Sequence, residues 1–233
     1  AKSEAIANIL ELGALKKEGR LGKLLVAGCL SQRYQDEILT EMPEVDGIMG
    51  TGSYTDVVPA LEALASGDHP RYFGDIQHTD EDGERIVTTP DYTAYLKIAE
   101  GCSNGCAFCI IPKLRGRYRS RTMDSLLSEA KLLADRGVKE LIVIAQDITR
   151  YGEDLKDGSN LETLLKELCK LPFHWIRLHY LYPEAVTDSL IATIASQPKI
   201  LHYLDIPIQH CNDRILSAMR RRTNKAQLTE LFA

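Results

Sequence analysis

Short apolar segments and amphipathic segments alternate four times from Tyr92 onward, and this alternation restricts the fold more than any other feature of the chain. Consecutive parallel strands need a crossover connection, usually a helix, so strand–helix units in series form a parallel sheet with covered faces. Such a series belongs either to a (β/α) barrel or to a doubly wound sheet, and four units are too few to close a barrel. The predicted strands are 93–99, 140–145, 175–180 and 203–208, and the predicted helices are 123–136, 160–170, 187–197 and 212–221.

Polar residues follow each of these predicted strands at the point where the strand ends. In parallel α/β folds, ligands bind at the carboxyl ends of the strands. We therefore expect the functional site at this edge of the sheet. The residues concerned are Glu100, Gln146, Asp147, Tyr180–Glu184, Gln209 and His210.

The first third of the chain predicts a smaller unit of the same class. Short apolar segments at 23–27 and 45–49 alternate with helical patterns at 2–18, 33–40 and 55–65. This order predicts a small parallel α/β domain.

Glycine and proline interrupt the alternation between the two units. The interrupted stretch predicts a linker, with a hairpin turn at Asp82-Gly83. The expected organisation is an N-terminal domain over 1–66, a linker over 67–91 and a second α/β domain over 92–233.

Composition excludes several classes of protein. Hydrophobic residues make up 44% of the chain and charged residues 26%, which is ordinary for a globular protein and unlike a disordered one. The longest apolar runs, such as Leu141–Ala145, are far shorter than the roughly 20 residues that a membrane span needs. The net charge of −5 does not favour a nucleic-acid groove. With no secretion signal in view, we expect a cytoplasmic protein that has no membrane partner.

The two ends of the sequence predict an internal fragment of a longer protein. The chain begins at Ala1, without Met and inside a helical pattern, and it stops at Ala233 inside another.

Three of the six cysteines lie within eight residues, as Cys102-Ser-Asn-Gly-Cys106-Ala-Phe-Cys109. This spacing is poor for a disulfide framework and good for a metal site. Structural zinc usually takes four ligands, whereas three thiolates can hold three irons of a [4Fe–4S] cube and leave the fourth iron open. Phe108 adds an aromatic ring that could lie against a flat cofactor base.

The pattern Cx₃CxφC after the first strand of a strand–helix series resembles the motif of the radical S-adenosylmethionine (SAM) superfamily. The resemblance implies a partial (β/α) radical SAM barrel and a [4Fe–4S] cluster on Cys102, Cys106 and Cys109. It implies that the open iron binds the amino and carboxylate groups of SAM, and that an electron from the cluster cleaves SAM to a 5′-deoxyadenosyl radical.

Cys29 lies in Gly28-Cys29-Leu30-Ser31-Gln32-Arg33-Tyr34, which resembles the methylthiotransferase family within that superfamily. The family carries a second [4Fe–4S] cluster on three cysteines of its N-terminal domain, and Cys29 matches the third of them. The other two would lie before Ala1, and the family's C-terminal β-barrel would follow Ala233.

Several stretches are similar to the branch of this family that modifies a ribosomal protein. In the tRNA branch, the loops that match 145–149 and 207–211 tend to read Gly-Gln-Asn-Val and Pro-Val-Gln-Ser-Gly, unlike this sequence. The stretches are Leu96-Lys-Ile-Ala-Glu-Gly-Cys102, Ile111-Pro-Lys-Leu-Arg-Gly-Arg-Tyr-Arg-Ser-Arg121, Ala145-Gln-Asp-Ile-Thr-Arg-Tyr-Gly152, Arg177-Leu-His-Tyr-Leu-Tyr-Pro183 and Leu204-Asp-Ile-Pro-Ile-Gln-His210.

The resemblance implies that a methylthio group is added to the β-carbon of an aspartate of ribosomal protein S-twelve. It implies two [4Fe–4S] clusters, SAM as cosubstrate, and an electron donor of the flavodoxin or ferredoxin type. The fragment alone would fully ligate only one cluster. The alternative within the family is the same chemistry on a tRNA adenosine, with tRNA as the partner.

Other residues near the strand ends carry both a functional and a structural interpretation. Gln146 and Asp147 stand where radical SAM enzymes usually receive the SAM amino group, although a loop or helix-cap pair is an equal interpretation. Gln209 could reach the ribose or the substrate, or could be a structural polar residue. Arg220-Arg221-Arg222 ends a predicted helix, where cations suit the helix dipole, and we assign it no role. A run of five cations beside the triplet is most simply a solvated basic loop: Lys113, Arg115, Arg117, Arg119 and Arg121.

Two further alternatives lie outside the methylthiotransferases. A binding protein without catalysis would hold iron–sulfur or zinc with four protein ligands. A radical SAM enzyme with a different transfer would lack the two upstream cysteines in its full-length chain.

Overall fold

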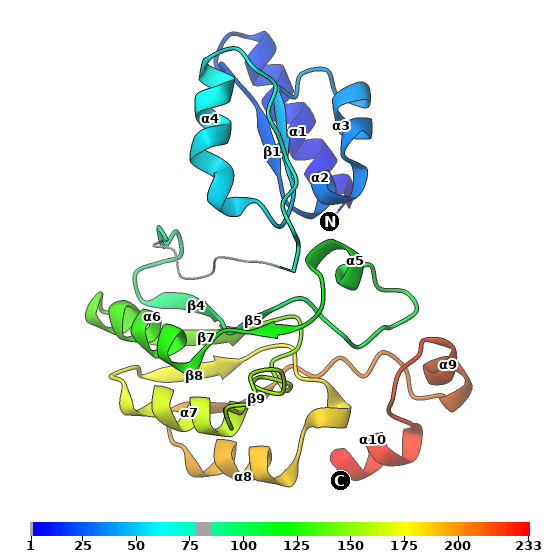
Figure 1. Ribbon diagram of the computed structural model, residues 1–233. Helices are drawn as coiled ribbons and strands as arrows, with labels where there is room; N and C mark the ends of the chain where they lie inside the picture. The colour runs from blue at the N-terminus through cyan, green and yellow to red at the C-terminus, as the bar shows by residue number, and fades with distance from the viewer. Residues whose placement is uncertain (1, 78–84) are drawn as a thin grey trace. The chain divides into compact units, whose positions relative to one another are not determined.

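The computed structural model describes residues 2–77 and 85–233 and divides into two compact units. The first unit comprises residues 1–81 together with 113–116, and the second comprises 82–112 together with 117–233. Figure 1 shows both units and labels most of their helices and strands.

The first unit is a small parallel sheet with helices, as predicted. Its strands have the order β1-β2-β3, and both pairings are parallel. Its elements are α1 (Lys2–Lys17), β1 (Leu25–Ala27), α2 (Cys29–Tyr34), α3 (Asp36–Glu41), β2 (Gly47–Met49), the 3-10 helix η1 (Tyr54–Asp56), α4 (Val57–Ala65) and β3 (Arg71–Tyr72).

One buried carboxylate ties the first helix of this unit to its sheet. Asp46 is 6% exposed, and its Oδ2 accepts hydrogen bonds from Lys16 Nζ at 2.6 Å and from the backbone N–H of Leu24 at 2.7 Å. Burial raises the pKa of Asp46, whereas these two hydrogen bonds lower it. The net pKa lies below its ordinary value.

Two expectations for this unit need correction. The helix predicted over 33–40 is two helices, α2 and α3, because the backbone at Gln35 turns to a φ of 38°. The stretch predicted as a linker contains a strand, β3, that pairs with β2. The hairpin turn predicted at Asp82-Gly83 lies outside the described residues.

The second unit contains the predicted series of strands and helices. Its main elements are β4 (Thr93–Lys97), α6 (Met123–Asp135), β7 (Glu140–Ile144), α7 (Leu161–Lys170), β8 (Trp175–Leu178), α8 (Asp188–Ser196), β9 (Ile200–Leu204), α9 (Asp213–Ala218) and α10 (Lys225–Leu231). The minor elements are β5 (Ala99–Glu100), β6 (Arg119–Ser120) and the 3-10 helix η2 (Pro183–Ala185). Helix α5 (Ile111–Arg115) is divided between the units, because residues 111–112 belong to the second and 113–115 to the first.

The strand order of the second unit selects barrel-like winding over a doubly wound sheet. Its main sheet has the order β4-β7-β8-β9 with parallel pairings throughout, so each strand lies beside the next in sequence. Helix α7 packs beside both α6 and α8. A doubly wound sheet would reverse its strand order at a switch point. The prediction of a partial (β/α) barrel is therefore confirmed.

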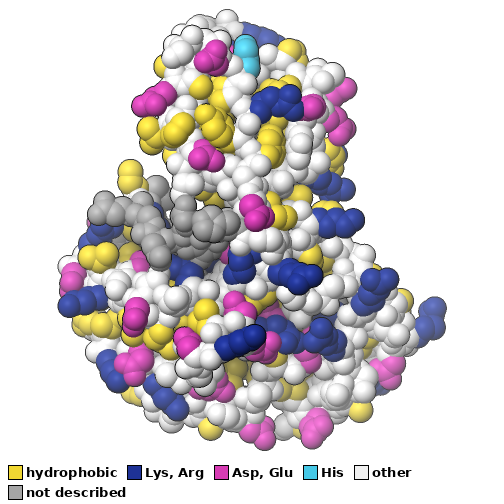
Figure 2. Space-filling view, viewed as in Figure 1, with side chains coloured by type: hydrophobic (Ala, Val, Ile, Leu, Met, Phe, Trp, Pro, Cys, Tyr) yellow, Lys and Arg dark blue, Asp and Glu magenta, His cyan; other side chains and the backbone are white. Residues whose placement is uncertain are grey.

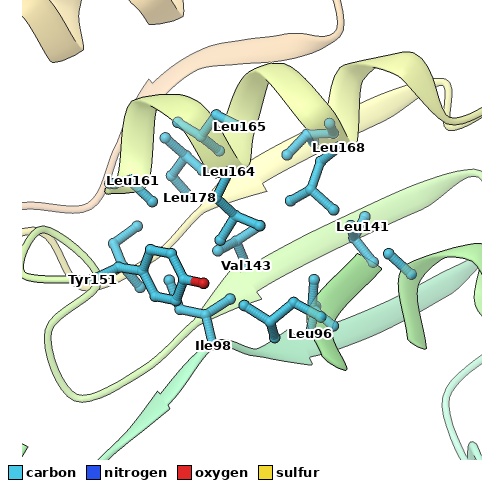
Figure 3. Close-up of a cluster of buried hydrophobic side chains, with 14 of the residues drawn as sticks. Leu96, Ile98, Leu141, Val143, Tyr151, Leu161, Leu164, Leu165, Leu168 and Leu178 are labelled. Carbon is cyan, nitrogen blue, oxygen red and sulfur yellow. The ribbon is translucent and has the colours of Figure 1, made fainter. Parts of the chain in front are cut away.

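The core of this unit lies between the sheet and its helices (Figure 3). On α7, Leu161, Leu164, Leu165 and Leu168 recur at the spacing of one helix face, and all four are at most 2% exposed. They point toward strand residues such as Val143. The apolar stripe seen in the sequence is therefore the buried face of the helix.

Helix starts in the second unit follow the capping rules. Thr122, Asn160 and Thr187 each accept a hydrogen bond from a backbone N–H in the first turn of α6, α7 and α8. Gly137, at a φ of 93°, follows the end of α6. These local signals explain why the predicted bounds of α6, α7 and α8 agree closely with the structure, whereas α9 ends at Ala218, three residues before its predicted end.

The fourth strand differs from its prediction. We predicted 203–208, whereas β9 spans Ile200–Leu204. Ile200 is 2% exposed and pairs with Ile176, and Pro207 lacks the N–H that a continuing strand would use. The polar cluster at Gln209 therefore follows a longer loop than expected.

Side chains form hydrogen bonds with the backbone along the outer edge of β4. Its outward carbonyls accept hydrogen bonds from three side chains: Thr89 Oγ1 bonds to Thr93, Arg85 Nη2 to Tyr95, and Arg121 Nη1 to Lys97. These contacts cover the backbone groups that another strand would otherwise use.

None of the described helices is both long enough and apolar enough to cross a membrane. Basic and acidic side chains are interspersed over the viewed face (Figure 2).

Candidate functional site

The cysteine triplet lies on an irregular loop that leaves β5 in the second unit. Gly101 and Gly105 adopt φ values of 77° and 68°, a region that residues with a Cβ rarely enter. The loop can therefore turn sharply at both positions.

All three thiols of the triplet are free. Cys102 and Cys106 are buried, at 5% and 8% exposed, whereas Cys109 is exposed. Burial raises the pKa of the Cys102 thiol, and the nearby Asp147, Cys109 and Cys106 add to the rise. A cation that withdrew charge from these sulfurs would reverse this effect, as iron does for its thiolate ligands.

Asp147 connects the cysteine loop to the loop that follows β7. The carboxylate is fully buried, and it accepts hydrogen bonds from Asn104 Nδ2 at 2.8 Å and from Thr149 N at 3.1 Å. Arg150 lies 3.3 Å from the same carboxylate and donates to Asn104 Oδ1 at 3.2 Å. Burial raises the pKa of Asp147, and its hydrogen bonds offset part of that rise. These contacts give Asp147 a structural role, and its predicted role toward SAM stays a prediction.

Gln146 has an unused acceptor. Its Oε1 is buried and has no hydrogen-bond partner in the part of the chain that the structure describes. A buried carbonyl oxygen without a donor is unfavourable by about 1–3 kcal/mol. An ammonium or other N–H donor of a ligand would satisfy it.

Arg221 lies buried beside the triplet. Its Nη1 is 3.8 Å from Cys106 Sγ, and its side chain is 1% exposed. We had assigned no role to Arg220-Arg221-Arg222 beyond the helix dipole. For Arg221 this interpretation is wrong, because α9 ends at Ala218 and the guanidinium turns inward to the cysteine loop.

Phe108 and Gln209 are both exposed at this edge of the unit. Phe108 is 57% exposed and lines a shallow apolar hollow with residues of α9, among them Ile215 and Ala218. Gln209 has a φ of 65° in the loop after β9. Neither side chain is buried in the core, and the predicted contacts of Phe108 with a cofactor base and of Gln209 with the ribose stay predictions.

Cys29 belongs to the first unit, whereas the other predicted site residues belong to the second. It is the first residue of α2 and is half-buried, with a free thiol. Gly28 before it has a φ of 112°, and its N–H donates to Met49 O at 3.2 Å. The cysteine therefore stands directly after a strand, at the carboxyl edge of that sheet.

The donor set of the triplet fits an iron–sulfur cube. Within residues 2–77 and 85–233, no three His, Cys, Asp or Glu side chains converge closely enough to hold one metal ion. A cube spreads three thiolates over three irons and does not require such convergence. The Nε of Arg221 is buried without a partner among the described residues, and thiolate or sulfide acceptors would satisfy it.

The sequence analysis missed two residues of this site. Asn104 lies inside the triplet, and its amide type is a signal that could have been weighed, because the loop brings it to Asp147. The sequence around Arg221 gave no indication of a site residue, since three consecutive arginines usually form a solvent-exposed basic segment. Of the basic loop, Arg121 has a structural role: it bonds to Glu129 at 2.5 Å and to Ser125 at 2.7 Å.

The partial barrel with a three-thiol loop after its first strand defines a class of enzyme. A family model, the radical SAM superfamily, matches residues 96–232, and the chain belongs to that superfamily. Membership implies a [4Fe–4S] cluster and SAM.

The relatives of this chain narrow the class further. It is 51% identical over its whole length to the ribosomal protein uS12 methylthiotransferase RimO of Pelobacter propionicus, and 50% identical to RimO of Geobacter sulfurreducens. The alignments cover 52% and 53% of those two proteins, so the chain spans about half the length of these relatives.

A solved structure of the same superfamily has a similar fold. The radical SAM methyltransferase TsrM of Kitasatospora setae, with tryptophan and a SAM analogue bound, matches 90% of this chain and 46% of its own chain at a TM-score of 0.67. At 12% sequence identity, this likeness concerns the fold alone.

Proposed function

We propose that this chain is the central part of a methylthiotransferase that adds a methylthio group to the β-carbon of an aspartate of ribosomal protein uS12. The observation that carries the proposal is the identity of about half of all residues to RimO proteins over the full chain. The loops 145–149 and 207–211, which differ from the tRNA branch, support the same substrate.

The triplet Cys102, Cys106 and Cys109 would hold the cluster that binds SAM. Bound there, the cluster and SAM supply the one-electron reduction and the hydrogen abstraction. Of the protein groups, Gln146 Oε1 is an unused acceptor for the SAM amino group. Phe108 and Gln209 would contact the base and the ribose of SAM, and Asp147 would fix Asn104 and with it the loop.

Cys29 would be one ligand of a second [4Fe–4S] cluster, which supplies the site for sulfur transfer. Its position just after a strand end and its free, half-buried thiol support this role. The other two cysteines of that cluster would come from the rest of the full-length protein.

The proposed organisation is a methylthiotransferase domain over 1–66, a connection over 67–91 and the radical SAM core over 92–233. The substrate is a ribosomal protein, so we place the reaction in the cytoplasm. A flavodoxin or ferredoxin would donate the electron.

Anaerobic reconstitution of the full-length protein tests the cofactor half of this proposal. Iron counting and EPR of the reduced protein should reveal two clusters, one of them with a spectrum that changes when SAM is added. Cys102→Ala should abolish the SAM-responsive signal, and Cys29→Ala should abolish only the other. Cys211→Ala, which removes an exposed cysteine outside the triplet, is the matched control and should retain both. A single cluster that is indifferent to SAM would refute the proposal.

The substrate half needs a competition between two acceptors. The reconstituted protein is incubated with SAM, sulfide and reductant, together with either uS12 or unmodified tRNA. Mass spectrometry should detect a methylthio group on an aspartate of uS12 and none on tRNA. Modification of tRNA alone would assign the protein to the alternative branch.

A further inference from the structure

The side chain of Arg221 is almost completely buried, and the proposed function gives it no role. Its side chain is 1% exposed, whereas neighbouring Arg222 is exposed. A buried guanidinium cannot lose its proton, so its positive charge must be balanced by groups around it.

The groups around Arg221 come from three loops at the carboxyl edge of the sheet. Nη1 lies 3.8 Å from Cys106 Sγ in the cysteine loop, and Nη2 donates to Pro207 O at 3.1 Å in the loop after β9. The guanidinium carbon lies 4.4 Å above the ring of Tyr182, in the loop after β8. Arg221 therefore joins the triplet to the two loops that follow β8 and β9.

The negative charge available to balance Arg221 is small. Glu184 is the carboxylate paired with it, at 3.8 Å, and Glu184 also accepts a hydrogen bond from Thr223 Oγ1 at 3.2 Å. The 3.8 Å distance is long for a charge-assisted hydrogen bond. The Nε of Arg221 is buried without a partner among the described residues. The site therefore has positive charge and a hydrogen-bond donor to spare, directly beside Cys106.

We propose that Arg221 is a positioning residue that sets the reduction potential of the cluster on the triplet. The reduction of that cluster by one electron from an external donor adds negative charge to a site that already carries three thiolates. A fixed cation and its N–H groups beside one thiolate stabilise the reduced form more than the oxidised form, so they raise the potential. The inference rests on the cluster in the proposed function, but not on the identity of the substrate.

The test is a potential measured by EPR-monitored redox titration of the SAM-responsive cluster in the full-length protein. Arg221→Gln should shift this potential to more negative values. A tenfold loss in the equilibrium constant for one-electron reduction equals about 59 mV, and we expect a shift of at least that size. Arg222→Gln removes the same charge from the exposed neighbour and should leave the potential within a small fraction of that shift. Arg221→Lys, which restores the charge, should recover part of it.

A second variant keeps the test decisive where Arg221→Gln fails to hold a cluster. Glu184→Gln is nearly isosteric and removes the carboxylate that partly balances Arg221, so it should move the potential in the opposite direction, to less negative values. Glu167→Gln removes a carboxylate paired with Lys170 on α7, a pair that does not contact the cysteine loop, and as the control it should leave the potential unchanged.

The outcomes separate this inference from the proposed function. A wild-type protein without a SAM-responsive cluster would overturn both. A wild-type cluster whose potential is the same in Arg221→Gln as in Arg222→Gln would overturn the inference alone, and so would an unchanged potential in Glu184→Gln. Opposite shifts in the Arg221 and Glu184 variants would establish it.

Discussion

Asn104 donates a hydrogen bond from Nδ2 to Oδ2 of Asp147 over 2.8 Å, although the two residues are 43 positions apart. The contact joins the loop of the cysteine triplet to the loop after β7, and both residues are buried. The position of the triplet therefore depends on a carboxylate that comes from a different strand–helix unit.

Replacing Asp147 with Asn should destabilise the protein. The substitution removes a buried charge, but it replaces one carboxylate oxygen with an N–H₂ group, so that one of the two donors, Asn104 Nδ2 or Thr149 N, then lacks an acceptor. We expect the free energy of unfolding to fall by about 1–3 kcal/mol, together with a loss of bound iron after reconstitution. Urea unfolding followed by circular dichroism measures the first effect. The exposed Asp135→Asn is the control and should change stability by less than about 0.5 kcal/mol. Equal stability of the two variants would show that the Asp147 contacts do not matter.

Replacing Gln146 with Met should separate ligand binding from stability. Because Oε1 of Gln146 has no hydrogen-bond partner among the described residues, the substitution breaks no hydrogen bond of that oxygen within the protein. We expect the affinity for SAM to fall about tenfold, corresponding to about 1.4 kcal/mol, with little change in unfolding free energy. Isothermal titration with SAM in the reconstituted protein measures the affinity. Gln197→Met, at the end of α8, should leave SAM affinity unchanged. Unaltered binding in Gln146→Met would remove this residue from the SAM site.

Asp46 should make the first unit sensitive to acid. Its pKa is lower in the folded chain than the value of about 3.9 expected when unfolded, so the carboxylate stabilises the fold above that pH. This stabilisation is lost as the pH falls through the lowered folded pKa. Asp46→Asn should therefore weaken protection of the β1 and β2 amides from hydrogen exchange by about 2 kcal/mol at pH 7. The difference from wild type should shrink as the pH falls below about 4, and it should disappear once the pH is below the lowered folded pKa, where Asp46 of the wild type is also uncharged. The exposed Asp68→Asn should match wild type at both pH values, and a difference for Asp46→Asn that persists unchanged in acid would contradict the assignment.

Shortening Leu164 should test the core of the second unit. The side chain is fully buried on α7 and points toward the sheet (Figure 3). Leu164→Ala should lower the unfolding free energy by about 2–5 kcal/mol because it removes buried surface and leaves a cavity. Leu132→Ala on α6 truncates a side chain that is 57% exposed and should have an effect below about 0.5 kcal/mol. Comparable midpoints for the two variants in urea unfolding would contradict this packing.

Local signals predicted most of the second unit because each element carries its own start and stop. Thr122 and Gly137 bracket α6, and the leucines of α7 repeat at helix spacing. The missed details depend on partners distant in sequence. Strand β9 starts early because Ile200 pairs with Ile176, and β3 is a strand only because β2 lies beside it.

The same distinction applies to the site. The triplet could be predicted because three cysteines in eight residues have few structural explanations. The place of Arg221 in the site could not be predicted, because it depends on contacts with residues that are distant in sequence. These residues are Cys106, Tyr182 and Glu184. The buried, satisfied state of Asp147 was equally hidden, since it depends on Asn104.

The side chains bonded to the outer edge of β4 restrict the edge at which a further strand can pair with the sheet. A strand approaching β4 would have to displace Thr89, Arg85 and Arg121 from the carbonyls they occupy. At the opposite end, β9 has no neighbour on its outer side among the described residues. Extension of the sheet, by another strand of this protein or by a second molecule, is thus directed to β9. Recombinant pieces that end near this strand should be handled as aggregation-prone, and charged substitutions on β9 should improve their solubility more than the same changes on β4.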